Sequence, residues 1–475
     1  MKARSIKVNA ALNTVKQCCQ VLFPVITIPY VTRVLGVDNY GKINFSNSIV
    51  SYFLLLASLG INSYAIREGA LVRNNKKIFE KFSDEVFTIN VISTIISYFV
   101  LFMVICIPQV GKYKSLILIQ SLVIILTTIG ADWVNSIYED YLYISFRYIL
   151  FQLIAVILLF IFVKTSSDYL KYALILVIGT AGGNVLNIFY IRRYVHLKLV
   201  FHFNWARHLI PILVLFGNQV AITLYVNSDV TMLGLLSSER MVGIYSLSSK
   251  IYTVVQQVLN ALLIVTIPRL SFYIGERRNE DFQKLADRVF RTLLTLMAPL
   301  VTGLFSFSKE IMELAGGEQY TIGSSSLKIL SITLLFSLIA GYFTNCILLP
   351  KKLEKRILLI TSTAAIINVF FNLIFIPTYG ANGASITTLL SELVVSIWSY
   401  KIAKKFLIHR SMKRDIGSIL VGCICIYFIC YISELFLSGS MIIMILCSVI
   451  VSVFVYFIIL FVLGNSVVRN KVRSI

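Results

Sequence analysis

A lysine within a long apolar stretch is the residue of this sequence with the clearest capacity for chemistry. Lys250 lies about seven residues into the stretch from Gly243 to Pro268, which is long and apolar enough to cross a bilayer. An ammonium group near the middle of a membrane helix costs about 2.5–3.5 kcal/mol on insertion scales. Such a group normally faces water or a charged partner, so we expect Lys250 to bind an anion or to pair with an acid.

More polar residues share the helical face that carries Lys250. Spacings of three and four place Ser246, Thr253, Gln257 and Asn260 on this face, which we call the polar stripe. The first apolar stretch has a stripe with the same spacing, formed by Asn13, Gln17, Gln20, Pro24 and Thr27. Small polar side chains in membrane helices often only join helices, for about 0.6–2 kcal/mol each. Each stripe therefore predicts either interhelical packing or the lining of a hydrated cavity.

Three further charged residues are candidates for a function. Asp229 is an acid within an apolar stretch, and it could pair with Lys250 or bind a proton or cation for ion coupling. Arg33 and Arg67 lie where two apolar stretches end. Arginine there either anchors a helix end at the headgroups or binds phosphate.

The composition identifies a polytopic membrane protein. Of the 475 residues 58% are hydrophobic and 14% charged, and the mean hydropathy is +0.85. The net charge of +21 does not indicate nucleic-acid binding, because the cations lie in short loops between apolar stretches. The four histidines and eight cysteines lack the spacing of metal ligands, so we expect no metal and no cofactor.

The hydropathy pattern predicts an all-α protein with fourteen transmembrane helices. The expected spans are 10–32, 43–64, 86–107, 115–137, 148–163, 170–191, 209–235, 243–267, 289–308, 326–349, 356–376, 382–402, 416–437 and 440–463. Most of the 43 lysines and arginines fall in one set of alternate loops and in the two termini. This asymmetry predicts that both termini lie in the cytoplasm and supports an even number of spans. The charged segment 269–288 is expected to be helical.

An internal repeat predicts how these spans are organised. A shift of 202 residues carries the second span onto the eighth, so that Gly41, Ser48 and Ser51 meet Gly243, Lys250 and Thr253. The same shift carries Gln17 to Gln219. A duplicated six-helix unit predicts two pseudo-symmetric lobes around a central cavity, at residues 1–208 and 209–405. Residues 406–475 would add two accessory helices.

The residue types of such a cavity would suit a large, polar, anionic cargo. Carboxamides and hydroxyls hydrogen-bond sugar hydroxyls, and lysine and arginine bind phosphate. The predicted polar lining comprises Gln17, Gln20, Ser48, Ser51, Gln219, Thr253, Gln257 and Asn260. The sequence has neither an ATP-binding Walker A motif nor a Ser/His/Asp set, so we expect a transporter and not an enzyme. Membrane polysaccharide polymerases and ligases share the hydropathy but typically carry a large external loop with catalytic Arg or His, and here the outer loops are short.

Several segments resemble one family of transporters. The run PYVTRVLGVDNYGKINFSNSIVSYFLLLASLGINSYAIREGA (29–70) resembles the N-terminal signature of Wzx-type polysaccharide flippases, which belong to the multidrug/oligosaccharidyl-lipid/polysaccharide exporter (MOP) superfamily. Similar matches are ADWVNSIYEDYLYISFR (131–147), DVTMLGLLSSERMVGIYSLSSKI (229–251) and IPTYGANGAS (376–385). One departure is the segment 135–137, Asn-Ser-Ile, where the family commonly has a glycine before the glutamate.

The resemblance implies a function that composition alone would not name. It implies flipping of undecaprenyl-pyrophosphate-linked oligosaccharide units from the inner to the outer leaflet by alternating access, for capsule, exopolysaccharide or O-antigen assembly. Lys250 and Arg33, with Arg67, match positions at which related flippases bind the pyrophosphate. The implied partners are this lipid-linked oligosaccharide, membrane lipids, and polymerase and chain-length proteins. A lipid II flippase and a cation-coupled multidrug antiporter of the same superfamily remain alternatives; the antiporter would use acids such as Asp229 and Glu392.

Overall fold

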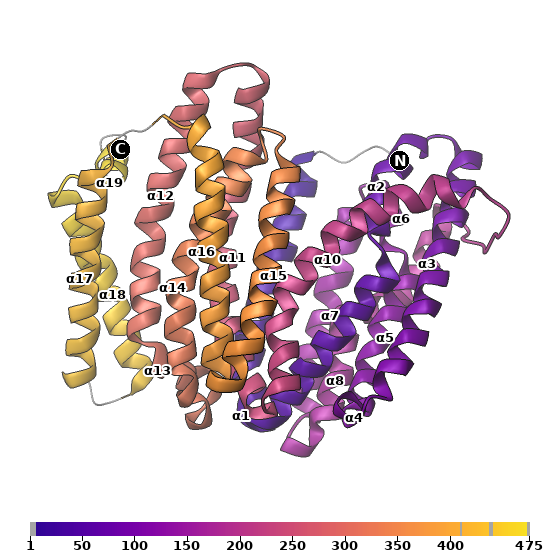
Figure 1. Cartoon of the computed structure of the whole chain (residues 1–475), viewed down its shortest axis with the longest axis horizontal. Helices are drawn as coiled ribbons and strands as arrows, with labels where there is room; N and C mark the ends of the chain where they lie inside the picture. Colours follow the sequence, from indigo (N-terminus) through magenta and orange to yellow (C-terminus); the bar gives the residue numbers. More distant parts are fainter. Residues whose placement is uncertain (1–5, 409–410, 437–439, 473–475) are drawn as a thin grey trace. The chain divides into compact units, whose positions relative to one another are not determined.

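The chain is helical throughout the part that the structure describes. The computed structural model describes residues 6–408, 411–436 and 440–472, and no strand occurs among them. These residues form two compact units, residues 1–243 and 244–475, which are described separately below (Figure 1). Within these described ranges, twelve helical segments are long and apolar enough to cross a membrane, so the chain is a multi-pass membrane protein.

Unit 1 is a bundle built around one interrupted helix. Its helices are α1 (Ile6–Ser58), α2 (Ile61–Val72), α3 (Lys76–Ile105), α4 (Pro108–Gly111), α5 (Lys114–Gly130), α6 (Asp132–Ile137), α7 (Tyr141–Phe162), η1 (Ser166–Asp168), α8 (Tyr169–Val177), η2 (Ile178–Gly182), α9 (Gly183–Tyr190), η3 (Ile191–Arg193) and α10 (Trp205–Leu236). The next helix, α11 (Glu239–Gly275), begins in unit 1 and continues into unit 2.

Gly36 divides α1 into two arms that run in opposite directions. Its backbone has φ 74° and ψ 172°, a conformation open to glycine but not to residues with a Cβ. Lys16 on the first arm lies beside Asp132 at the start of α6. After the second arm, Gly69 of α2 again packs against α6, at Ile137. The chain therefore reverses at a single residue, and a continuous helical segment, Val15–Val72, covers what the sequence predicted as two spans.

Unit 2 contains the remaining helices. They are α12 (Asn279–Ser306), α13 (Ser308–Gly316), η4 (Glu318–Gly323), α14 (Ser324–Gly341), η5 (Tyr342–Leu348), α15 (Glu354–Tyr379), α16 (Ala381–Ala403), η6 (Lys404–Phe406), α17 (Lys413–Phe436), α18 (Met441–Val462) and α19 (Ser466–Val472). Both α14 and α15 pack along α16, and the charged segment 269–288 is largely helical, as predicted.

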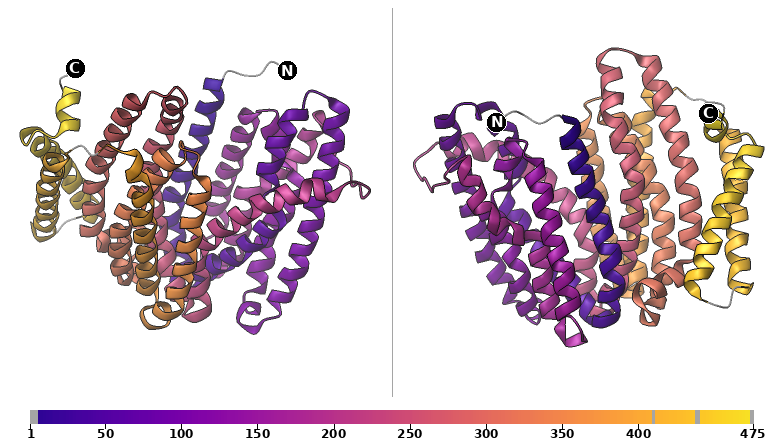
Figure 2. Two further views of the ribbon diagram at one scale, coloured as in Figure 1. Left: turned by 45° about the horizontal axis from the view of Figure 1, so that its top comes forward. Right: turned by 180° about the vertical axis from the view of Figure 1, so that it is seen from behind.

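The last helices are held to α12 by one buried carboxylate. Asp415, at the start of α17, pairs with Arg291 of α12. The same carboxylate accepts hydrogen bonds from the Ser466 backbone N–H at 2.7 Å and from the Ser466 hydroxyl at 2.8 Å. Farther along the helices, the hydroxyl of Tyr456 donates to the carbonyl of Thr295 at 2.9 Å. The pair α17 and α18, side by side in Figure 2, is thus part of unit 2.

The helices often extend beyond the spans that hydropathy predicted. The span expected at 86–107 is α3, which begins at Lys76 because the Asn75 side chain caps it by accepting a hydrogen bond from the Ile78 N–H. The first ten residues of α3 are rich in charge, so hydropathy alone does not find them. The span expected at 115–137 ends earlier, because Ala131 takes a left-handed conformation (φ 43°) and α6 then starts at Asp132.

Candidate functional site

Lys250 lies on the exposed face of α11 in unit 2. The residue is exposed, whereas Leu247, Ser248, Leu259 and Leu263 of the same helix are buried. Part of the buried face is polar, since the amide of Gln256 donates to the Ser337 hydroxyl at 2.7 Å and to the Tyr252 hydroxyl at 3.0 Å. The helix thus keeps its charged residue away from the packed interior of unit 2, as expected for a cation that meets water or an anion.

The other residues of the polar stripe differ in exposure, and Ser246 is buried. Gln257 is exposed, and Thr253 and Asn260 are half-buried. The Thr253 hydroxyl donates to the carbonyl of Ser249 on its own helix at 2.7 Å. This local bond satisfies the hydroxyl without a neighbouring helix.

Arg33 and Arg67 are both exposed, and they lie on different elements of unit 1. Arg33 is on the first arm of α1, three residues before the reversal at Gly36. Arg67 is on α2, where its Nε donates to the Glu68 carboxylate at 2.9 Å. Since Ala65 and Gly69 of α2 pack near α6, at the opposite end of the helices from Gly36, unit 1 does not bring these two arginines together.

The predicted lining residues of unit 1 fall into two groups. Gln17, Gln20 and Gln219 are exposed, whereas Ser48 is buried between α1 and α10. Thr231 of α10 donates to the Ser48 hydroxyl at 2.9 Å, and the Ser51 hydroxyl donates to the carbonyl of Ser48 at 2.6 Å. Ser48 therefore takes part in helix packing, and the lining of a cavity by the whole set stays a prediction.

Asp229 is buried in α10, with 4% of its surface exposed, and its charge acts on Tyr52 of α1. Glu392 of α16 is also buried, with its charge close to Tyr252. Asp229 and Lys250 belong to different units, so their pairing stays a prediction.

The sequence analysis missed a buried polar cluster on α2, α3 and α10. His208 is 1% exposed, with Nε2 at 2.8 Å from the Glu85 carboxylate and Nδ1 at 2.7 Å from the Tyr64 hydroxyl. The sequence places His208 in a basic loop, whereas α10 begins at Trp205 and carries it into the bundle. The signal that could have found it is Glu85, an acid near the expected start of an apolar span.

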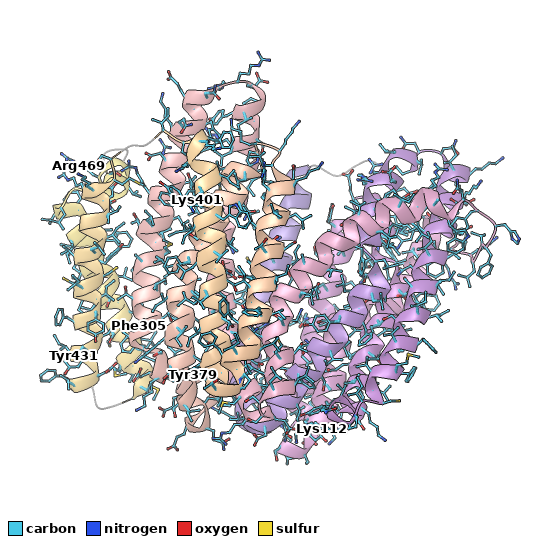
Figure 3. The ribbon with its side chains drawn as sticks, viewed as in Figure 1. Lys112, Phe305, Tyr379, Lys401, Tyr431 and Arg469 are labelled. Carbon is cyan, nitrogen blue, oxygen red and sulfur yellow. The ribbon has the colours of Figure 1, made fainter. Side chains whose placement is uncertain are left out.

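A second missed cluster surrounds Glu239, where α11 begins. Its carboxylate lies 3.6 Å from the Lys42 ammonium and 3.7 Å from that of Lys112, which extends from the turn between α4 and α5 (Figure 3). The Tyr113 hydroxyl donates to the same carboxylate at 2.7 Å. Burial and the Glu239 carboxylate raise the pKa of Tyr113 well above its usual value. The cluster ties the start of α11 to α1 and α5.

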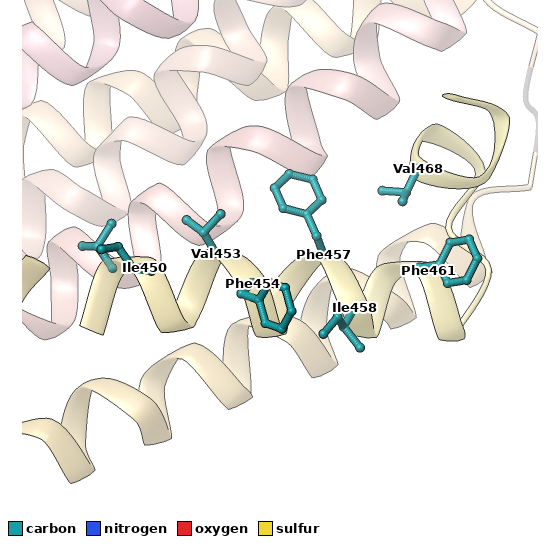
Figure 4. A pocket seen from close by; sticks show the side chains of 8 residues that line it. Ile450, Val453, Phe454, Phe457, Ile458, Phe461 and Val468 are labelled. Carbon is teal, nitrogen blue, oxygen red and sulfur yellow. The ribbon is translucent and has the colours of Figure 1, made fainter. Parts of the chain in front are cut away.

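Unit 2 also has an apolar groove on α18. A cavity of about 670 Å³ lies over α18 and is open along one side (Figure 4). It is lined by Val449, Ile450, Val453, Phe454, Phe457, Ile458, Phe461 and Val468. An acyl or polyprenyl chain fits this lining, but so does every lipid of a bilayer, so the groove by itself selects no ligand.

The comparison with protein families decides the identity. The sequence pattern of the family described as "Polysaccharide biosynthesis protein" matches residues 6–273, more than half of the chain. The chain belongs to this family. The pattern of the MatE family matches residues 215–374. The sequence-based prediction of a Wzx-type flippase of the MOP superfamily is therefore confirmed.

Two relatives and one solved structure are similar to most of the chain. A putative O-antigen transporter of Escherichia coli (strain K12) is 24% identical over 82% of this chain and 95% of its own length. The capsular polysaccharide biosynthesis protein CapF of Staphylococcus aureus is 23% identical over 78% of this chain and 91% of its own. The structure of the lipid II flippase MurJ, in an inward closed conformation, superposes with a TM-score of 0.77 at 16% identity, covering 97% of this chain and 100% of that one. This last likeness shows a common fold.

Proposed function

We propose that this chain moves undecaprenyl-pyrophosphate-linked oligosaccharide units from the inner to the outer leaflet of the bacterial cytoplasmic membrane. The observation that carries the proposal is Lys250, an exposed cation on a helix long enough to span the membrane. A cation kept out of the packed interior, beside amide side chains, suits a pyrophosphate with attached sugars. The names of the O-antigen and capsule relatives support a polysaccharide unit as the cargo.

The arrangement that we propose is a pair of duplicated lobes, with fourteen spans and both termini in the cytoplasm. Twelve apolar segments support it, since Val15–Val72 reverses at Gly36 and is long enough to cross twice. The helix Lys114–Gly130, with 17 residues, is a further short apolar segment. Polysaccharide polymerase and chain-length proteins would then act on the product in the outer leaflet.

A reciprocal contact within unit 1 supports the duplication. A Cβ on Gly41 would lie 1.9 Å from the Glu239 carbonyl oxygen, and a Cβ on Gly243 would lie 2.2 Å from that of Val37. The shift of 202 residues relates Val37 to Glu239 and Gly41 to Gly243. The shift therefore converts each of these two contacts into the other, as a two-fold axis does. A pseudo-two-fold axis between these segments supports two related lobes. A lobe boundary at 208 would place α10 in the second lobe, although it packs against α1.

The experiment is the substitution Lys250→Gln, with Lys250→Arg beside it, in the native host. We expect Lys250→Gln to insert normally and to stop surface polysaccharide assembly, and Lys250→Arg to retain part of it. Lys284→Gln is a matched control, because this lysine is an exposed residue of α12 in a surface ion pair with Glu280. A normal polymer yield from the Lys250→Gln variant would remove Lys250 from the mechanism.

Two other functions fit the same fold. The match to MatE and the buried acids Asp229 and Glu392 favour a cation-coupled multidrug antiporter, which binding of organic cations to the purified protein would reveal. The structural likeness to MurJ keeps a lipid II flippase open. Deletion of the gene distinguishes the two flippase functions. Loss of viability indicates a lipid II flippase, whereas a viable strain without surface polysaccharide indicates the oligosaccharide flippase.

A further inference from the structure

Unit 1 contains a small charged pocket that none of the predicted site residues lines. The cavity measures about 50 Å³ and lies between the first arm of α1, the start of α6, α7 and the segment from η2 to α9. Its polar lining consists of Lys16, Asp132, Arg147, Tyr148, Thr180 and Asn184. Small-molecule sites usually measure roughly 300–1,000 Å³, so this pocket has room for a single small charged group.

The guanidinium of Arg147 is buried with one nitrogen unsatisfied. Arg147 is 5% exposed, its Nη2 pairs with the Asp132 carboxylate, and its Cζ lies 5.3 Å from the centre of the Tyr143 ring. Its Nη1 has no hydrogen-bond partner among the residues that the structure describes. The same carboxylate oxygen of Asp132, Oδ1, also accepts a hydrogen bond from the Asn187 amide at 3.0 Å. A buried N–H group without an acceptor costs about 1–3 kcal/mol, and more when it is charged. The arrangement therefore favours an acceptor within the pocket.

A second cation makes the pocket positive. The Lys16 ammonium lies 5.5 Å from the centre of the Tyr148 ring, and no ion pair involves it among residues 6–408, 411–436 and 440–472. With Arg147 and Lys16 against Asp132, the pocket carries one positive charge in excess. An organic cation would be repelled, whereas an oxyanion would meet two cationic lining residues, Arg147 and Lys16.

The backbone around Arg147 is adapted to hold it in place. A Cβ on Gly183 would lie 2.9 Å from the Arg147 Cγ, so only glycine lets the side chain lie against α9. The preceding turn, Ile178–Gly182, is a π-helix, and Gln152 donates to the Gly179 carbonyl at 3.2 Å. Single π-helical turns occur frequently at functional sites. The left-handed Ala131 directs Asp132 into α6 beside the guanidinium.

We propose that this pocket binds one phosphate group of the lipid-linked substrate, as a contact in unit 1 separate from Lys250. The proposal rests on the proposed function for the source of the phosphate. Lys16 lies in the first half of the first arm of α1, and Arg147 lies in the first third of α7. With the amino terminus in the cytoplasm, the pocket therefore lies toward the inner leaflet, where the substrate is loaded.

The test measures binding of farnesyl diphosphate, a short-chain polyprenyl diphosphate, to the full-length protein in phosphatidylcholine nanodiscs. We expect Arg147→Gln and Lys16→Gln each to weaken binding about tenfold, equivalent to about 1.4 kcal/mol. Lys164→Gln is the matched control, since this exposed lysine follows the opposite end of α7. Arg147→Gln leaves Asp132 without its charge partner and could disturb folding, whereas Lys16→Gln breaks no ion pair.

Three further arms identify the bound group and separate this proposal from the proposed function. If inorganic phosphate competes and phosphatidylglycerol does not, the site prefers the substrate's phosphate over a phospholipid headgroup. If phosphatidylglycerol in the nanodisc removes the effect of both variants, or if a folded Lys16→Gln variant binds like the wild type, the proposal is wrong. Loss of polymer assembly in the Lys250→Gln strain together with unchanged binding by the Lys16→Gln variant would refute the pocket alone. Normal polymer assembly in the Lys250→Gln strain together with weakened binding by the Lys16→Gln variant would refute only the role of Lys250 in the proposed function.

Discussion

Replacing His208 by alanine tests whether the buried cluster of α2, α3 and α10 stabilises unit 1. The ring of His208 is 1% exposed and makes both its contacts, at 2.8 Å and 2.7 Å, with side chains inside the bundle. Its removal leaves the Glu85 carboxylate, 8% exposed, and the Tyr64 hydroxyl without this partner. Breaking a buried pair in this way costs about 3–5 kcal/mol. For a unit of this size, about 2–4 °C of melting temperature corresponds to 1 kcal/mol, so we expect a decrease of roughly 6–20 °C.

The assay is a thermal unfolding curve of the purified protein in detergent, monitored by tryptophan fluorescence at a fixed heating rate. His202→Ala is the control, because His202 is an exposed histidine close by and should change the stability by less than about 0.5 kcal/mol. Glu85→Gln keeps an acceptor for the ring and should lower the melting temperature less than His208→Ala. If His208→Ala and His202→Ala melt together, the cluster does not stabilise the fold and the reasoning is refuted.

Two other predictions concern helix packing. Gly41→Ala and Gly243→Ala should each lower the melting temperature or the yield of folded protein, because the new methyl group meets a carbonyl oxygen at 1.9 Å or 2.2 Å, whereas Gly217→Ala, with nothing within 4 Å of its Cβ, should have no such effect. Equal stability of all three variants would contradict the close packing of α1 against the start of α11. Asp415→Asn should expose the segment from α17 to α19 to limited proteolysis, since it weakens the ion pair with Arg291 and the bonds to the start of α19. An unchanged cleavage pattern would mean that apolar packing alone holds these helices.

Much of the fold follows from local properties of the sequence. Apolar runs of about 20 residues predict spans because the bilayer fixes their length. The spacing of the polar stripe predicted that Lys250 faces a hydrated cavity or a charged partner, which stays a prediction, and the structure gives Lys250 as exposed. The helical segment 269–288 was predicted from charge spacing, and the pair Glu280–Lys284 forms at 3.5 Å.

The residues that the sequence did not reveal are those whose partners lie far along the chain. Arg147 meets Asp132 only because α6 turns back at a left-handed alanine, and no spacing rule predicts that contact. His208 likewise depends on Glu85, more than a hundred residues earlier. Hydropathy predicted a turn between the spans 10–32 and 43–64, but it did not show that the helix is interrupted at Gly36 alone.

The two copies of the proposed repeat do not carry the same charged residues, and helix packing explains the difference. Ser48 and Lys250 are equivalent under the 202-residue repeat, but Ser48 is 2% exposed, and its hydroxyl both donates to the Phe45 carbonyl and accepts from Thr231. A lysine at position 48 would have to bury an ammonium group against α10, at a cost of several kilocalories per mole. In the second copy the equivalent position is exposed, so the packing of unit 2 leaves room for a lysine side chain there. Anion contacts in unit 1 then have to come from other positions, and the buried Arg147 with its unsatisfied nitrogen is such a position.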